Sequence, residues 1–213
     1  MSHDINSLAQ RIQQLSSGSQ GRTVVGIVGP PGAGKSTLAE ALAIRTGAVW
    51  LPMDGYHLSN EQLHALGRRE RKGAPDTFDA KGFTHLLERI RARPDEEIFA
   101  PRFDRTIEES IAAEIRIGPE DRIVIVEGNY LLLDTSGWEG IRPLLHECWY
   151  VDPPSLLRSS RLVSRHREFG KTLEGATAWV SAVDSGNAAI VEATKYKADL
   201  VISDWGSAQV DRP

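Results

Sequence analysis

The chain has 213 residues, of which 40% are hydrophobic and 25% are charged, and its formal net charge at neutral pH is −4. This composition is typical of a globular protein, and the small acidic excess argues against a general binder of nucleic acid or of acidic membranes. No apolar run approaches the length of a membrane span, and a single cysteine, Cys148, suits a reducing compartment. We therefore expect a cytoplasmic protein in which residues 1–213 form one domain.

The chain is expected to open with a helix and then to alternate short strands with helices. Apolar residues at helical spacing within residues 1–20 predict an amphipathic N-terminal helix. Helix formers follow at 35–47 and 80–94, and residues 96–104 are expected to add an edge strand or a flap over the substrate. Short apolar strands separated by helices predict a three-layer α/β/α sandwich around a mainly parallel five-stranded sheet. The expected strands are 23–28, 48–53, 122–127, 147–151 and 199–203.

The stretch "GPPGAGKST" carries the strongest chemical signal in the sequence. It satisfies the pattern G-x-x-x-x-G-K-[ST], with a predicted strand before it and a predicted helix after it. That context predicts a phosphate-binding loop rather than a glycine-rich turn without a ligand. Lys35 should reach the β- and γ-phosphates of ATP, and Ser36 should bind Mg²⁺. The residues expected to hold the nucleotide are Gly29, Pro30, Pro31, Gly32, Ala33, Gly34, Lys35, Ser36 and Thr37.

Two acids follow predicted strands and should therefore lie near this loop. Asp54 comes after the run "AVWLP", and Glu127 comes after "IVIV". In an open parallel sheet, ligands bind outside the carboxyl ends of the strands. Glu127 is a candidate for holding Mg²⁺ or its water, and Asp54 for taking the proton of an acceptor hydroxyl. The alternatives are that Glu127 caps the next turn and that Asp54 serves only the turn "DG".

Two basic segments have different interpretations. In "RSSRLVSRHR", Arg158, Arg161 and Arg165 share one helical face and could offset the charge of the phosphates. Residues 158–175 would then form a helical lid with a hinge at "FGKT", the alternative being a solvated surface helix. The other segment, "GRRERKG" at 67–73, is most simply a solvated surface. The histidines form no metal-binding pattern, although His57 is a candidate for touching substrate.

The motifs, taken in order, resemble the superfamily of phosphoribulokinase, uridine kinase and pantothenate kinase. The similarity is greatest to a bacterial branch labelled fructose transport system kinase, or nucleoside/nucleotide kinase-like. It covers about residues 23–202 and rests on "GPPGAGKSTLA", "MDGYHLSN", "RKGAPDTFD", "PRFDR", "VEGNYLLL" and "GNAAIVEATKYKADLVI".

The resemblance implies a P-loop kinase that transfers the γ-phosphoryl group of ATP to an alcohol of a small metabolite. It implies that Asp54 is the catalytic base and that Glu127 lies near Mg²⁺. Arg161 and Arg165 would contact the ATP phosphates from the lid. The acceptor pocket would contain Tyr56, Asp76, Phe78, Phe103 and Arg105.

Our leading hypothesis is therefore an ATP- and Mg²⁺-dependent kinase of a hydroxylated small molecule, with no nucleic acid or membrane as partner. The alternative is a regulatory NTPase that acts as a nucleotide-dependent switch. The sequence names neither the acceptor, whether sugar, nucleoside or vitamin precursor, nor the nucleotide base. A homodimer is also left open, since four tryptophans are expected either in the core or at an interface between two copies: Trp138, Trp149, Trp179 and Trp205.

Overall fold

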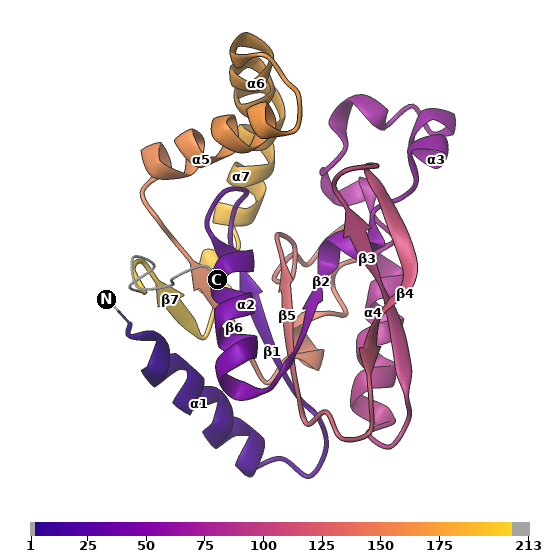
Figure 1. Cartoon of the computed structure of the whole chain (residues 1–213), viewed down its shortest axis with the longest axis vertical. Helices are drawn as coiled ribbons and strands as arrows, with labels where there is room; N and C mark the ends of the chain where they lie inside the picture. Colours follow the sequence, from indigo (N-terminus) through magenta and orange to yellow (C-terminus); the bar gives the residue numbers. More distant parts are fainter. Residues whose placement is uncertain (1–2, 206–213) are drawn as a thin grey trace.

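The computed structural model describes residues 3–205, and its centre is a five-stranded sheet (Figure 1). The strand order is β2–β5–β1–β6–β7, and every neighbouring pair is parallel. The predicted parallel sheet is confirmed, and no strand differs by more than one residue at either end from its expected range. The strands are β1 Thr23–Val28, β2 Val49–Pro52, β5 Ile123–Gly128, β6 Glu147–Val151 and β7 Leu200–Ile202.

Helices cover both faces of the sheet, as the predicted three-layer sandwich requires. Successive side chains of a strand point to opposite faces, so each strand contributes to two cores. Val24 and Val124 pack in a cluster with helix α4, whereas Val25 and Ile125 pack in a second cluster with helices α1 and α2. The bounds of these helices are α1 Ile5–Ser17, α2 Lys35–Thr46 and α4 Ala80–Ala92. None of the helices within residues 3–205 is both long and apolar enough to cross a membrane.

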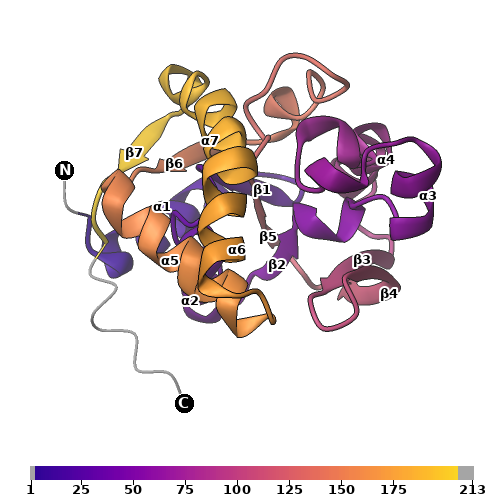
Figure 2. The ribbon, with the colours of Figure 1, turned by 90° about the horizontal axis from the view of Figure 1, so that it is seen from above.

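Further helices stand over the carboxyl edge of the sheet (Figures 1 and 2). We call residues 155–192 the overhanging helices. Between α6 and α7 the chain stays helical but widens into one π-helical turn, Val180–Asp184. The α-helical parts are α5 Ser155–Glu168, α6 Leu173–Trp179 and α7 Ser185–Glu192.

A separate antiparallel ribbon stands beside the sheet, on the side of β2 and α3 (Asn60–Ala65). It consists of β3 (Ile98–Asp104) and β4 (Glu109–Ile117). Of the two alternatives for residues 96–104, the edge strand is wrong, because within residues 3–205 strand β3 pairs with β4 and not with the main sheet, whereas the flap over the substrate stays a prediction. Strand β4 was not expected, and most of its side chains are at least partly exposed.

One buried arginine ties the base of this ribbon to the sheet. Arg22, just before β1, is 1% exposed. Its guanidinium donates hydrogen bonds to four backbone carbonyl oxygens, those of Asp121 (3.2 Å), Arg93 (3.1 Å), Glu96 (2.8 Å) and Gly118 (2.8 Å). These carbonyls belong to the segments that enter β3 and leave β4. A single side chain therefore satisfies polar groups that burial would otherwise leave unpaired.

Replacing Arg22 with Met should destabilise the fold, because it removes the donors but leaves the carbonyls buried. We expect the Arg22→Met change to lower the free energy of unfolding by about 3 kcal/mol. The matched control is Arg122→Met, since Arg122 is exposed and, within residues 3–205, its guanidinium donates to the carbonyl oxygens of Ser19 and Gln20 alone. The Arg122→Met change should lower the free energy of unfolding by less than about 1 kcal/mol. Urea denaturation of both variants measures the difference, and equal effects would contradict the role given to Arg22.

Candidate active site

Residues 29–34 connect β1 to α2 at the carboxyl edge of the sheet, and the phosphate-binding motif continues through residues 35–37 in the first turn of α2. Gly34 precedes α2 with φ +88°, and Gly32 has φ +76°, so both have a backbone conformation that suits glycine. The loop is also tightly packed against α5. A Cβ atom on Gly32 would lie 2.8 Å from the carbonyl oxygen of Arg158. Glycine therefore stands at two positions where the backbone of the loop has a positive φ, and at Gly32 it also makes room for α5.

Lys35 and Ser36 begin α2, and both reach Glu127 at the end of β5. The Lys35 Nζ atom donates to the Pro30 carbonyl oxygen at 3.1 Å and lies 3.8 Å from Glu127 Oε1. Ser36 Oγ donates to Glu127 Oε2 at 3.2 Å. Burial lowers the pKa of Lys35, although the negative charge of Glu127 opposes this effect. Glu127 thus links an ammonium group and a hydroxyl group.

Asp54 lies directly beyond β2, in the short 3-10 helix Met53–Tyr56. Pro52, at the end of β2, is in register with Glu127 on β5, so the two acids leave neighbouring strands at the same edge. Arg105, from the turn of the ribbon, donates to Asp54 Oδ2 at 2.9 Å. This ion pair joins the sheet to the ribbon across the candidate site.

The two acids differ in their electrostatic surroundings. Burial raises the pKa of Glu127, Lys35 opposes the increase, and the negative charge of Asp54 adds to it. Burial also acts to raise the pKa of Asp54, but nearby positive charges outweigh burial and hold this pKa below the ordinary carboxylate value. Those charges come from His57, Arg105, Lys35 and Arg165. Asp54 is therefore a carboxylate at neutral pH and can accept a proton.

Gly55 explains how Asp54 can lie against the ribbon. A Cβ atom at position 55 would come within 2.2 Å of the Pro101 carbonyl oxygen on β3. Because only glycine permits this approach, the "DG" pair brings the ribbon close enough for Arg105 to reach Asp54. The Asp54–Gly55 pair therefore forms the turn and also positions Asp54 against the ribbon.

Aromatic rings form one wall of the site. The ring of His57 lies 3.9 Å from that of Phe78 and 4.7 Å from that of Phe103, measured between centroids. His57 Nδ1 lies 2.9 Å from the Asp54 carbonyl oxygen. Burial lowers the pKa of His57, although the charge of Asp54 and the hydrogen bond to its carbonyl oxygen oppose this effect. The His57 ring is tilted by 42° against that of Phe78 and by 39° against that of Phe103, so the wall is aromatic but not flat.

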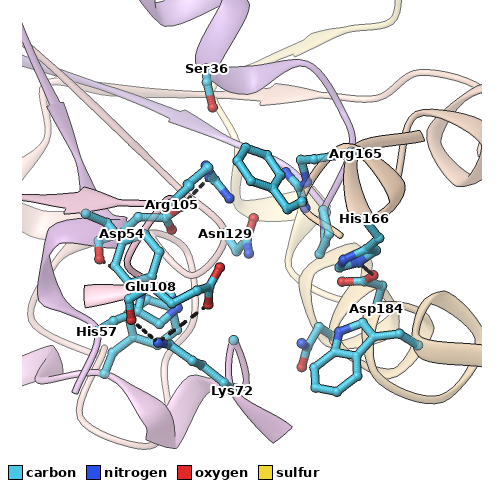
Figure 3. A pocket seen from close by; sticks show the side chains of 18 of the residues that line it. Ser36, Asp54, His57, Lys72, Arg105, Glu108, Asn129, Arg165, His166 and Asp184 are labelled. Atoms are coloured by element: carbon cyan, nitrogen blue, oxygen red, sulfur yellow. Dashed lines mark hydrogen bonds and ion pairs between the residues drawn. The ribbon is translucent and has the colours of Figure 1, made fainter. Parts of the chain in front are cut away.

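The overhanging helices supply the opposite wall, which Figure 3 shows with Arg165, His166 and Asp184 facing Asp54 and Arg105. His166 Nε2 lies 2.8 Å from the Asp184 Oδ2 atom, and Asp184 is the last residue of the π-helical turn. Burial lowers the pKa of Arg165, as does the charge of Arg105. Arg161 lies over the phosphate-binding loop, since a Cβ atom on Gly34 would be 3.3 Å from its Nη1 atom.

A cavity of about 290 Å³ lies between these walls. Most of the residues that the sequence marked for chemistry line it together. These are Pro31, Gly32, Lys35, Ser36, Asp54, His57, Phe78, Phe103, Arg105, Glu127 and Arg165. The remaining members of the loop (Gly29, Pro30, Ala33, Gly34 and Thr37) and Arg161 are not among the lining residues.

Tyr56 and Asp76, both expected in the acceptor pocket, are also not among the residues that line the cavity. The ring of Tyr56 packs on that of Phe83 from α4, with centroids 5.0 Å apart, and burial raises its pKa to about 12. Asp76 forms ion pairs with Arg68 and Arg71. The structure therefore places Tyr56, partly buried, against the core, and Asp76 in a partly exposed cluster of ion pairs.

Several cavity residues were not predicted. Arg69 and Lys72 belong to the basic segment at 67–73, which the sequence suggested was solvated. Asn129 follows Glu127 by two residues, a spacing that could have indicated it. Glu108 lies in the ribbon turn at φ +57°, and no local pattern indicates it. The other unpredicted lining residues are Gly73, His166, Phe169, Lys171, Trp179, Asp184 and Asn187.

Protein side chains alone do not form a metal site in the part of the chain that the structure describes. Residues 3–205 contain no group of three or more His, Cys, Asp or Glu side chains that could hold a metal ion. The hydroxyl of Ser36 and the carboxylate of Glu127 are nevertheless oxygen donors of the kind that Mg²⁺ prefers. Phosphate oxygens would have to complete such a site.

Comparisons with known proteins agree with this geometry. The Phosphoribulokinase / Uridine kinase family matches residues 24–211. The chain is 34% identical to the "Putative uridine kinase C227.14" of Schizosaccharomyces pombe over 86% of its own length and 83% of that protein. It is also 34% identical to the protein YggC of Escherichia coli, with 86% and 78% covered.

Solved structures show the same relationship. The crystal structure named "putative fructose transport system kinase from Silicibacter sp. TM1040" has a TM-score of 0.86 and 36% identity, covering 92% of this chain and 98% of that one. YFH7 from Saccharomyces cerevisiae shares the fold at a TM-score of 0.84 with 20% identity, covering 95% and 99%. The chain therefore belongs to the phosphoribulokinase/uridine kinase family and is an ATP-dependent kinase of small molecules.

Proposed function

We propose that residues 1–213 act as one kinase domain in which the acceptor hydroxyl lies between Asp54 and the phosphate-binding loop. The observation that carries this proposal is the position of Asp54. It is a carboxylate at the sheet edge, held by Arg105, in the same cavity as Lys35 and Ser36. In this arrangement Asp54 accepts the hydroxyl proton as the γ-phosphoryl group is transferred in line.

The remaining roles follow from charge and position. Lys35 binds the β- and γ-phosphates, and Ser36 and Glu127 would hold Mg²⁺, directly or through a water, so that the ion would neutralise charge on the phosphoryl oxygens. Arg161 and Arg165 approach the loop from the overhanging helices and offset the charge that develops during transfer. We further propose that residues 158–175 close over the nucleotide as a lid. His57, Phe78 and Phe103 would form the surface on which the acceptor rests.

The location and assembly of the protein are also part of the proposal. We place the kinase in the cytoplasm, in keeping with one free, buried thiol, Cys148. Trp138, Trp149 and Trp205 are buried within their own chain, and Trp179 lines the cavity. The interface of a homodimer would therefore not be built from the three buried tryptophans, whereas Trp179 is partly exposed.

The Asp54→Asn substitution should lower kcat by at least about 100-fold, because the amide cannot take the proton, while ATP affinity stays within about twofold. Asp76→Asn is the matched control, since Asp76 lies outside the cavity lining and should leave kcat within about threefold. The measurement is acceptor-dependent ADP release, with ATP binding followed by calorimetry. An Asp54→Asn enzyme that turns over like the wild type would rule out the base assignment.

The dependence of kcat on pH should change when Arg105 is replaced. Because positive charges hold the pKa of Asp54 below its ordinary value, wild-type activity should persist as pH falls and be lost only when Asp54 is protonated. The Arg105→Gln change removes one of those charges and should move the acid limb of kcat upward by about one pH unit. Profiles of both enzymes from about pH 4 to 8 test this expectation. An unmoved acid limb would show that another group controls it.

A further inference from the structure

The charges that line the cavity do not all have partners. Three lining carboxylates pair with lining cations: Asp54 with Arg105, Glu127 with Lys35 and Glu108 with Lys72. Two further lining guanidinium groups, those of Arg69 and Arg165, have no ion pair or hydrogen bond within residues 3–205. Both are only partly exposed. A half-buried cation without a partner favours an anionic ligand.

The two unpaired arginines act on different ends of the cavity. Arg165 belongs to the nucleotide end, where its charge influences Lys35 and Asp54, and the transferred phosphoryl group accounts for it. Arg69 belongs to the short 3-10 helix Arg69–Arg71 and influences Lys72. Figure 3 shows Lys72 and Glu108 at the end of the cavity away from Ser36. The phosphates of ATP therefore do not account for Arg69.

Lys72 differs from Arg69 because it is already engaged. Its Nζ atom donates to Asn60 Oδ1 at 2.9 Å and to the Glu108 carbonyl oxygen at 2.6 Å. It also lies 4.9 Å from the centroid of the Phe103 ring. Burial and then the charge of Arg69 act to lower the pKa of Lys72, so a nearby anion would relieve the repulsion between the two cations. Within residues 3–205, the Arg69 guanidinium therefore has no partner at this end, whereas the Lys72 ammonium group does.

We infer that the phosphoryl acceptor carries an anionic group, a carboxylate or a phosphate ester, which the guanidinium of Arg69 binds while Asp54 holds the reacting hydroxyl. This inference rests on the proposed kinase function. A guanidinium group binds either anion with two parallel hydrogen bonds. The cavity, about 290 Å³, is at the low end of the range for small-molecule sites, about 300–1,000 Å³, so the acceptor should be a compact hydroxy acid or sugar phosphate.

Matched acceptors test this inference by varying charge on one carbon skeleton. The three-carbon set is glycerol, D-glycerate and glycerol 3-phosphate; the five-carbon set is ribose, ribonate and ribose 5-phosphate; glucose, gluconate and glucose 6-phosphate form the six-carbon set. ADP release with Mg·ATP gives kcat and KM for each compound. At least one charged member should exceed its neutral partner in kcat/KM by about tenfold or more. Comparing the carboxylic acid with the phosphate ester in each set then shows which of the two anions the enzyme uses.

Two arginine variants locate the effect. Arg69→Gln should raise KM for the charged acceptor about 10- to 100-fold with kcat nearly unchanged, and should remove most of the preference over the neutral partner. Arg71→Gln is the matched control from the same turn, because Arg71 pairs with Asp76 and is not a lining residue. It should leave both parameters within about threefold. Thermal unfolding of both variants confirms that each is folded.

The outcomes separate this inference from the kinase proposal. If neutral acceptors, or uridine as a neutral nucleoside, are used as well as charged ones, the kinase function stands and the inference is wrong. It is also wrong if Arg69→Gln weakens neutral and charged acceptors equally. Calorimetry with Mg·AMP-PNP-saturated enzyme measures acceptor binding without turnover. If no compound binds there or raises ADP release, both the proposed function and the inference fail.

Discussion

The pairing of Lys35 with Glu127 is the interaction on which the rest of the site depends. Their side chains are 7% and 8% exposed, and the Nζ and Oε1 atoms lie 3.8 Å apart. Removing two charges from water is costly, and a buried pair at this distance does little to stabilise a fold. In the function proposed above, the pair instead serves to receive a phosphate group and a metal cation. The register of the sheet fixes it, because Glu127 lies opposite Ile27 on β1 and Pro52 on β2.

Much of this arrangement could be predicted because it follows from parallel strands. Runs of β-branched residues marked the five strands, and parallel strands place their carboxyl ends at one edge. Asp54 and Glu127 could thus be assigned to the neighbourhood of the phosphate-binding loop without any knowledge of contacts. The kinase interpretation agrees with the family to which the chain belongs, and a nucleotide-dependent switch does not.

The acceptor end of the site could not be predicted, because the residues that line it come from turns, where no periodic pattern indicates which side chains face the cavity. In the basic segment at 67–73, Arg71 pairs outward with Asp76 while Arg69 and Lys72 line the cavity. A single 3-10 turn decides which side chain faces which way, and no sequence pattern records that choice. Strand β4, by contrast, does place apolar residues at every second position, Ile111, Ala113, Ile115 and Ile117, and this alternation could have indicated a strand, although only Ile117 of the four is buried.

The π-helical turn at Val180–Asp184 implies that residue count, as much as residue identity, sets which side of the overhanging helices faces the cavity. A π turn contains one more residue than an α turn and shifts the phase of everything that follows it. Each residue of an α-helix turns the chain by about 100° and advances it about 1.5 Å. Deleting one residue from the turn would restore regular α-helix and rotate Asn187 and α7 relative to α6. Insertions and deletions in this turn would thus change which side chains of α7 face the cavity, while leaving the amino-acid composition of this wall almost unchanged.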